Sequence, residues 1–154
     1  MHELRVPGDK SITHRALILA ALAEGPSRIR GALTGEDCRS TARALRALGC
    51  AVPELESSAI EFKGVGLHGL RDPTGQLDCG NSGTTARLLM GVVAGTECTA
   101  TFDGDASLRM RPMQRVSEPL SQMGARIQEL GQAGKLPMRI RGARLNPYEY
   151  TSPQ

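Results

Sequence analysis

Residues 8–15 read Gly-Asp-Lys-Ser-Ile-Thr-His-Arg, and this stretch opens an apolar helix that we expect from Ile12 to Glu24. A second stretch of the same kind, Gly-Asn-Ser-Gly-Thr-Thr-Ala-Arg at residues 80–87, opens a helix over Thr84–Ala94. Each stretch places backbone N–H groups, hydroxyls and a guanidinium at a helix start, where the helix dipole favours negative charge. The pair therefore predicts two sites for anionic groups, and one or two small molecules that carry several charges.

The two stretches begin two copies of one pattern, with a period of about 70–78 residues. In both copies we expect a short strand after the first helix, at residues 28–33 and 99–102. A second helix follows, and Gly49 or Gly124 suits the left-handed position after its end. Each copy closes with a strand that ends in glycine, at Ile60–Gly64 and Met138–Gly142. The chain is therefore predicted to be an α/β (α+β) protein made of two βαβαββ units.

These units set the predicted domain boundaries. Residues 1–8 form a lead-in strand or hinge, residues 9–76 the first unit, residues 77–150 the second unit and residues 151–154 a truncated tail. We expect Pro112 in the first turn of a helix, where its missing N–H is harmless. Pro119 does not suit a helix interior, so we expect that helix to be kinked or to start later.

Composition excludes several classes of function. No apolar run reaches the roughly 18 residues of a membrane span, and no cleavable leader is evident, so we expect a cytoplasmic protein. A net charge of +3, no Trp, two Phe and two Tyr argue against nucleic-acid binding. The four cysteines form no Cys-x-x-Cys pair and no cluster with histidine, so we expect no metal and no cofactor. Cys79 adjoins the second glycine-rich loop, and we expect it to pack at a strand end rather than act as a nucleophile.

The first loop offers Lys10, Ser11 and Arg15 as candidate ligands for an anion. In a helix that begins near Ser11, Ser11 and Arg15 share a face, and Lys10 lies at the mouth beside free N–H groups. An ordinary helix cap by Asp9 or Ser11, with Lys10 in solvent, also fits this loop taken alone. The spacing of a Walker phosphate loop is absent.

The second loop offers Asn81, Gly83, Thr84 and Arg87. The glycine lets the backbone approach a ligand closely, and the polar side chains can both cap the helix and donate to oxygen atoms. Arg87 lies four residues after Gly83 and should rise over the loop. A plain helix cap fits this loop alone, but two such loops in one chain favour anion binding.

A third cluster lies at residues 107–112. Arg111 directly precedes Pro112 and is expected at a helix N-terminus, a position where a guanidinium can grip an anion. A solvated basic turn is the alternative. We expect Asp105 to pair with Arg109 or Arg111 and to orient it.

The phrases at residues 7–15, 77–89 and 104–113 together resemble the 5-enolpyruvylshikimate-3-phosphate synthase family, the glyphosate-inhibited transferases of the shikimate pathway. The resemblance runs from about Leu4 to Tyr150 and covers the first third of the family's length. It implies the enolpyruvyl transferase (inside-out α/β) fold, of which this chain would form a partial lobe with Leu4 to Gly8 near the hinge. It also implies transfer of an enolpyruvyl group from phosphoenolpyruvate to shikimate 3-phosphate, with release of phosphate, in chorismate and aromatic amino acid biosynthesis.

The same resemblance implies a role for each matching residue. Lys10 would be catalytic and contact both substrates, while Ser11 and Arg15 would hold shikimate 3-phosphate. Phosphoenolpyruvate, or glyphosate in its place, would be held by Asn81, Gly83, Thr84, Arg87 and Arg111. Gly83 is typical of glyphosate-sensitive members, whereas residues 104–113 look more like the tolerant class, so sensitivity stays open.

The family's proton-transferring acidic residues lie in the portion that this chain does not match. We therefore expect the chain alone to bind weakly and turn over little, and to need the C-terminal part of the enzyme as partner. The tail departs from the family's Ser-Ala-Gln phrase, so Gln154 receives no role. Two alternatives are kept: a relative that transfers enolpyruvate to UDP-N-acetylglucosamine, which should read Gly-Ala-Lys-Asn at residues 8–11, and a stand-alone anion-binding module.

Overall fold

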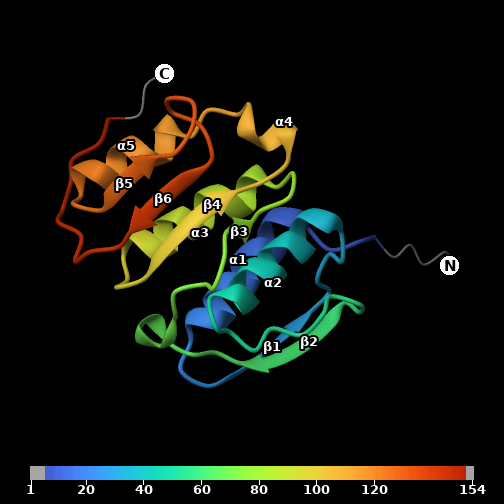
Figure 1. Cartoon of the computed structure of the whole chain (residues 1–154). Helices are drawn as coiled ribbons and strands as arrows, with labels where there is room; N and C mark the ends of the chain where they lie inside the picture. The colour runs from blue at the N-terminus through green and yellow to red at the C-terminus, as the bar shows by residue number, and fades with distance from the viewer. Residues whose placement is uncertain (1–5, 152–154) are drawn as a thin grey trace, which may run out of the picture.

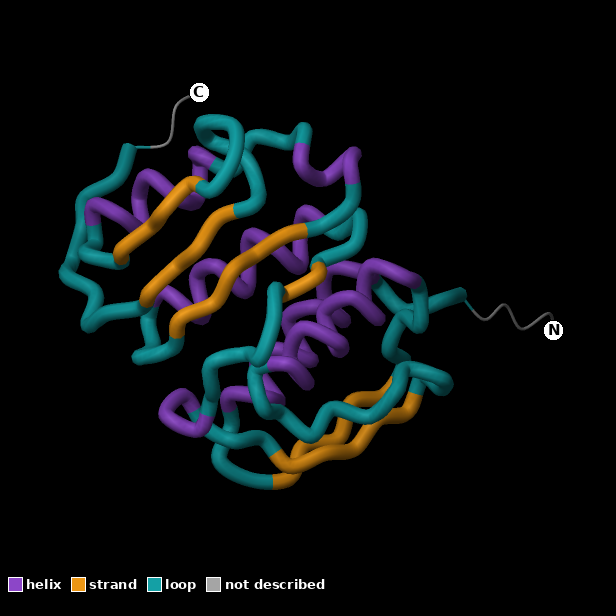
Figure 2. Tube along the Cα trace, viewed as in Figure 1, coloured by secondary structure: helices purple, strands orange, loops and turns teal. Residues whose placement is uncertain are grey.

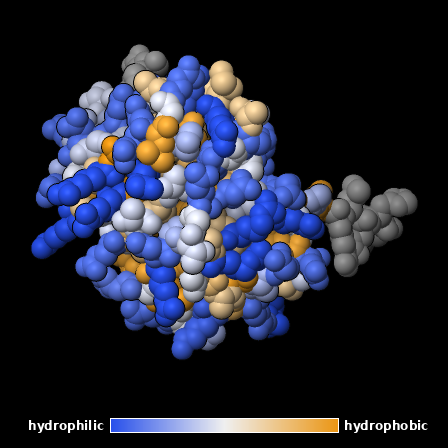
Figure 3. Space-filling model, viewed as in Figure 1, coloured by the Kyte–Doolittle hydropathy of each residue, from blue (hydrophilic) through white to orange (hydrophobic). Residues whose placement is uncertain are grey.

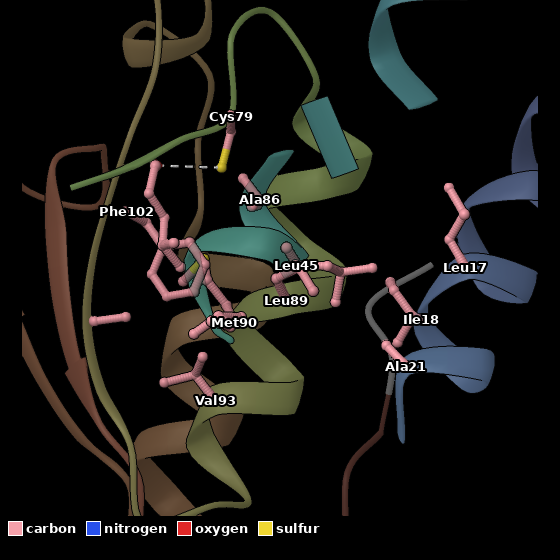
Figure 4. Packing of buried hydrophobic residues seen from close by; sticks show 14 of the residues in the cluster. Leu17, Ile18, Ala21, Leu45, Cys79, Ala86, Leu89, Met90, Val93 and Phe102 are labelled. Atoms are coloured by element: carbon pink, nitrogen blue, oxygen red, sulfur yellow. Dashed lines mark hydrogen bonds between the residues drawn. The ribbon is translucent and has the colours of Figure 1, made fainter. Parts of the chain in front are cut away.

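Three helices pack against one another at the centre of the molecule (Figure 1): α1 (Lys10–Leu22), α2 (Glu36–Ala47) and α3 (Gly83–Ala94). The computed structural model describes residues 6–151, so most of the predicted lead-in strand and tail lies outside the described residues. Leu17, Leu45 and Leu89, one from each helix, have no exposed surface. Figure 4 shows these side chains turned toward the shared core. Burying each of them stabilises the fold by about 1.5–3 kcal/mol, so helix packing is a main source of stability.

Two sheets flank these helices (Figure 2). Strands β1 (Pro26–Arg30) and β2 (Ala59–Lys63) pair antiparallel and contact α1. The second sheet has the order β3-β4-β6-β5, with β3 parallel to β4 and the other pairs antiparallel. Its strands are β3 (Leu77–Asp78), β4 (Thr99–Asp103), β5 (Arg126–Glu129) and β6 (Met138–Arg141). Helices α3 and α5 (Gln114–Gln122) cover one face of this sheet.

Alternation along the strands separates the two faces of the larger sheet. Phe102 of β4 and Ile140 of β6 are fully buried against the helices, whereas Arg139 and Arg141 are exposed on the opposite face. The exposed face appears largely hydrophilic in Figure 3. The alternation of buried and exposed residues typical of a half-exposed strand is therefore present in β4 and β6.

The second half of the chain has the predicted order of elements. It runs β3-α3-β4-α5-β5-β6, with one short additional helix, α4 (Ala106–Arg109). Gly49 and Gly124 follow α2 and α5 with φ values of 91° and 110°, as expected for left-handed positions after a helix. The predicted α/β class is confirmed, since the described chain is mixed helix and sheet.

The first half departs from the predicted pattern within the residues described. It contains α1, β1, α2, β2 and the short turn η1 (Leu67–Gly69), but residues 48–58 form no strand. The sequence explains this difference. Pro53 lacks the N–H that a sheet ladder needs, and Arg46 donates hydrogen bonds to the carbonyls of Val52 and Pro53 at 3.3 and 3.2 Å.

The predicted position of Pro112 is wrong. Residues 106–109 form α4. In the turn that follows, the N–H of Arg111 donates a hydrogen bond to the carbonyl of Leu108 at 3.0 Å. Pro112 thus connects two helices, and α5 starts two residues later, with fully buried Met113 before it. For Pro119 the sequence predicts a helix that is kinked or starts later. Helix α5 does start late, but Pro119 still lies inside it. None of the described helices is long and apolar enough to cross a membrane.

Candidate anion-binding site

The start of α1 is built around Asp9, which acts as the N-cap by accepting a hydrogen bond from the N–H of Ile12 at 2.7 Å. Lys10 follows directly and is not simply solvated. Its Nζ lies 3.0 Å from Oδ2 of Asp37, and its side chain remains 52% exposed. An exposed ion pair of this kind is weak, because solvent screens it. Lys10 is therefore positioned by α2 and still available to an incoming anion.

Ser11 and Arg15 lie on one exposed face of α1, as their spacing predicted. Nη1 of Arg15 donates to the carbonyl oxygen of Ser11 at 3.0 Å, which folds the guanidinium back over the first turn. Both residues thus lie beside Lys10 at the positive end of the helix dipole.

The second loop is held by the carboxyl ends of two parallel strands. Asp78, at the end of β3, accepts a hydrogen bond from the N–H of Gly80 at 2.8 Å. Asp105, just beyond β4, donates its N–H to the carbonyl of Gly80 at 2.9 Å. Gly80 has a φ of 56°, a conformation that favours glycine. Ser82 then caps α3 by accepting from the N–H of Thr85 at 3.2 Å.

Arg87 and Arg111 converge on Gly83, the buried first residue of α3. A Cβ atom built on Gly83 would lie 2.6 Å from Nη1 of Arg87 and 3.3 Å from Nη1 of Arg111. Nη2 of Arg87 also donates to the carbonyl of Pro112 at 3.1 Å. Within residues 6–151 neither guanidinium forms an ion pair with a carboxylate. Two guanidinium groups without a direct carboxylate partner, beside a helix N-terminus, favour a ligand with two negative charges.

Asn81 links this pair of arginines to Asp105. Its Oδ1 accepts from Nη2 of Arg111 at 2.6 Å, and its Nδ2 donates to Oδ2 of Asp105 at 2.7 Å. The hydrogen bond from Asn81 is the main reason that the pKa of Asp105 lies below its usual value, and the N–H of Leu108 adds to the effect. Asp105 therefore acts on Arg111 through the side-chain amide of Asn81. Thr84, the remaining predicted residue of this loop, lies half-buried in the first turn of α3.

The predicted direct pairing of Asp105 with an arginine is wrong. Arg109 instead pairs with Asp103, with Nε and Nη2 at 2.8 and 2.6 Å from its two carboxylate oxygens. These hydrogen bonds lower the pKa of Asp103 although its burial acts in the opposite direction. The reason is that Asp105 is already committed as the N-cap of α4, through the N–H of Leu108 at 2.7 Å.

A buried chain of hydroxyls connects the two helix starts, and sequence reasoning missed most of it. Nδ1 of His14 lies 2.7 Å from Oγ1 of Thr41, which lies 2.6 Å from Oγ1 of Thr85. Oγ1 of Thr85 also reaches Oγ of Ser82 at 2.8 Å and the carbonyl of Asp37 at 3.3 Å. Asp37 itself holds Lys10, so the starts of α1, α2 and α3 lie together.

Cys79 has a packing role. It is fully buried in the core beside Ala86 of α3 (Figure 4). Burial, with the nearby charges of Asp78 and Asp103, raises its pKa to about 12. A thiol of that pKa is not ionised near neutral pH and is a poor nucleophile. Among residues 6–151 no group of three or more His, Cys, Asp or Glu side chains is placed to hold a metal ion.

The fold and the site define an α/β protein with helix starts, glycine loops and arginines arranged for anionic small molecules. The chain belongs to the EPSP synthase (3-phosphoshikimate 1-carboxyvinyltransferase) family, whose model matches residues 1–154. The enzyme of that name from Rhodopseudomonas palustris (strain HaA2) is 58% identical over 140 residues, which are 91% of this chain and 32% of that protein. The one from Bradyrhizobium diazoefficiens is 54% identical over 142 residues, 92% of this chain and 30% of that protein.

A solved structure agrees with these relatives. The EPSP synthase from Acinetobacter baumannii matches with a TM-score of 0.91 and 41% identity, over 97% of this chain and 34% of that chain. The predicted family and fold are thereby confirmed. The chain spans about a third of the length of the relatives it matches.

Proposed function

We propose that this chain supplies the substrate-binding helix starts for transfer of an enolpyruvyl group from phosphoenolpyruvate to shikimate 3-phosphate. In this reaction the 5-hydroxyl of shikimate 3-phosphate gives up its proton and its oxygen adds to C2 of phosphoenolpyruvate, while C3 gains a proton. The tetrahedral intermediate then loses phosphate and the C3 proton, which leaves the enol ether. The observation that carries the proposal is the convergence of Arg87 and Arg111 on Gly83, with no direct ion pair from either guanidinium to a carboxylate among the described residues.

Phosphoenolpyruvate fits the start of α3. Its carboxylate and its phosphate ester are both attached to C2, and two guanidinium groups can each bind one of them in a bidentate manner. Gly83 leaves room for this because it has no side chain, and Asn81 fixes the direction of Arg111. Asn81, Gly83, Thr84, Arg87 and Arg111 form this half of the site. Glyphosate, with a carboxylate and a phosphonate, competes for the same half.

Shikimate 3-phosphate fits the start of α1. Ser11 and Arg15 lie together on its exposed face and offer a hydroxyl and a guanidinium to the phosphate. Lys10 stands between the two helix starts, because Asp37 holds its Nζ and also accepts a hydrogen bond from Thr85. The ammonium group of Lys10 contacts both substrates and balances the charge that develops at the departing phosphate oxygen.

The proton transfers at C3 require acidic residues outside the segment of the family that this chain matches. The chain alone therefore binds its substrates weakly, and it catalyses their turnover when the remaining portion of the enzyme is supplied. The four free cysteines, all buried, suit a reducing compartment, and we place the reaction in the cytoplasm.

Phosphate release from the two substrates tests this proposal. The chain is assayed alone and mixed with the C-terminal two thirds of the Rhodopseudomonas palustris relative. Release is expected only in the mixture, and Arg87→Gln should abolish it. Arg126→Gln, which removes the same charge from the exposed face of the larger sheet, should leave it unchanged. Binding without turnover in the mixture would favour an anion-binding module. A preference for UDP-N-acetylglucosamine over shikimate 3-phosphate would favour transfer of the enolpyruvyl group to that nucleotide sugar.

A further inference from the structure

We infer that His14, Thr41 and Thr85 are positioning residues that hold the start of α1 and the start of α3 in one fixed arrangement. The inference rests on the proposed function, because it explains how two half-sites on separate helices can serve one reaction. None of these three side chains belongs to the residues that we propose to touch a substrate.

The three residues form an unbroken path across three helices. His14 comes from α1, Thr41 from α2 and Thr85 from α3, and their contacts of 2.7 and 2.6 Å lie at the short end of the hydrogen-bond range. His14, Thr41 and Thr85 have no exposed surface, and Ser82, the next residue in the path, is 1% exposed. Hydrogen bonds in such surroundings are strong, and they are costly to break.

The direction of the hydrogen bonds follows from the unused nitrogen of His14. Its Nε2 is buried and has no hydrogen-bond partner. A proton on Nε2 would leave a buried N–H without an acceptor, whereas a proton on Nδ1 is donated to Thr41. We therefore assign the neutral ring a proton on Nδ1. Thr41 then donates to Thr85, and Thr85 donates to Ser82 or to the carbonyl of Asp37.

The path ends at the backbone that carries the second half-site. Ser82 caps α3, and Gly83, on which both arginines converge, is the next residue. The path begins one turn after Lys10 and directly before Arg15. A shift of about 1 Å between groups that act on one substrate can reduce rate by about 100-fold. Rigid attachment of the two helix starts therefore matters for function as well as for stability.

The experiment compares Thr85→Val with Thr96→Val. Thr96 is a matched control, because its buried hydroxyl also forms two hydrogen bonds but lies past the far end of α3. Phosphoenolpyruvate and shikimate 3-phosphate are each titrated into the full chain, and amide hydrogen exchange is measured without ligand. Thr85→Val should weaken binding about tenfold and speed exchange at Thr13 on α1, whereas Thr96→Val should do neither, and Thr85→Ser should restore both.

Equal effects of Thr85→Val and Thr96→Val on binding, or unchanged exchange at Thr13 in Thr85→Val, would overturn the inference. The two readouts also separate it from the proposed function. If the unsubstituted chain binds neither substrate, the proposed function fails, while exchange on α1 still decides whether Thr85 positions that helix.

Discussion

The guanidinium of Arg111 donates to the side-chain oxygen of Asn81 at 2.6 Å, and this contact ties the turn before α5 to the loop before α3. The two residues lie thirty positions apart in sequence. Because the other end of the Asn81 amide is anchored on Asp105, the amide cannot rotate without losing a hydrogen bond. The orientation of the Arg111 side chain is therefore fixed by Asn81 and Asp105, neither of which is positively charged.

Replacing Asp105 by Asn tests this relay. An asparagine can still cap α4, but its amide nitrogen cannot accept the hydrogen bond that Asn81 donates. We expect Asp105→Asn to leave the melting temperature nearly unchanged and to weaken phosphoenolpyruvate binding about fivefold to tenfold in calorimetric titration. Unchanged affinity would show that Arg111 is held without this carboxylate.

Replacing Gly83 by Ala should separate binding from stability. The added methyl group would lie 2.6 Å from Nη1 of Arg87, so this flexible guanidinium must move while the backbone can stay. We expect phosphoenolpyruvate affinity to fall by about tenfold or more, with no loss of stability. Gly91→Ala is the control on the same helix, because nothing lies within 4 Å of its added carbon. It should stabilise the chain by about 0.5–1 kcal/mol in urea unfolding and leave affinity unchanged.

His14 should make stability depend on pH near neutrality. Burial lowers its pKa below 6.5, against the opposing effect of Asp37, so the unfolded chain binds the proton more readily than the folded chain. Stability should therefore be complete above pH 6.5 and fall as the pH decreases below that value. Urea unfolding from pH 8 to about pH 5 should show this slope, and His14→Asn should flatten it. An identical slope in both proteins would contradict the assignment of a neutral buried ring.

Asp103 should also make stability fall as the pH decreases, but at lower pH than His14. The hydrogen bonds from Arg109 lower its pKa in the folded state, so its contribution is present above the unfolded value of 3.8 and disappears as the pH falls through the folded value. We expect Asp103→Asn to cost about 1–2 kcal/mol at pH 7, a range that allows for the half-exposed arginine. The difference between the two proteins should shrink toward pH 2. A difference that stays constant with pH would exclude the ion pair as its cause.

Sequence predicted the parts of this site that depend on local chemistry. Glycines after helices and the shared face of Ser11 and Arg15 follow from rules that act within one turn, and capping by Asp9 is one of the two alternatives that these rules left open. The convergence of Arg87 on Gly83 also follows from helical spacing. These features appear in the structure as the sequence indicated.

Contacts between distant segments could not be predicted in this way. Thr41 lies in the middle of α2 and has no local signal that separates it from an ordinary buried threonine, yet it joins α1 to α3. Asp103 and Asp105 are both acidic and close to two arginines, and only the formation of α4 decides which one caps a helix. The predicted unit has two closing strands, but the first half of the described chain lacks one of them, because the carbonyls of Val52 and Pro53 accept hydrogen bonds from Arg46.

The most direct measurement is an NMR titration of the isotopically labelled chain with shikimate 3-phosphate at a constant concentration of phosphoenolpyruvate. If the starts of α1 and α3 form one site, the backbone amides of Ser11 and Gly83 should shift in a single saturable transition with one dissociation constant. Shifts confined to exposed arginines such as Arg126 and Arg139, without saturation, would contradict the account.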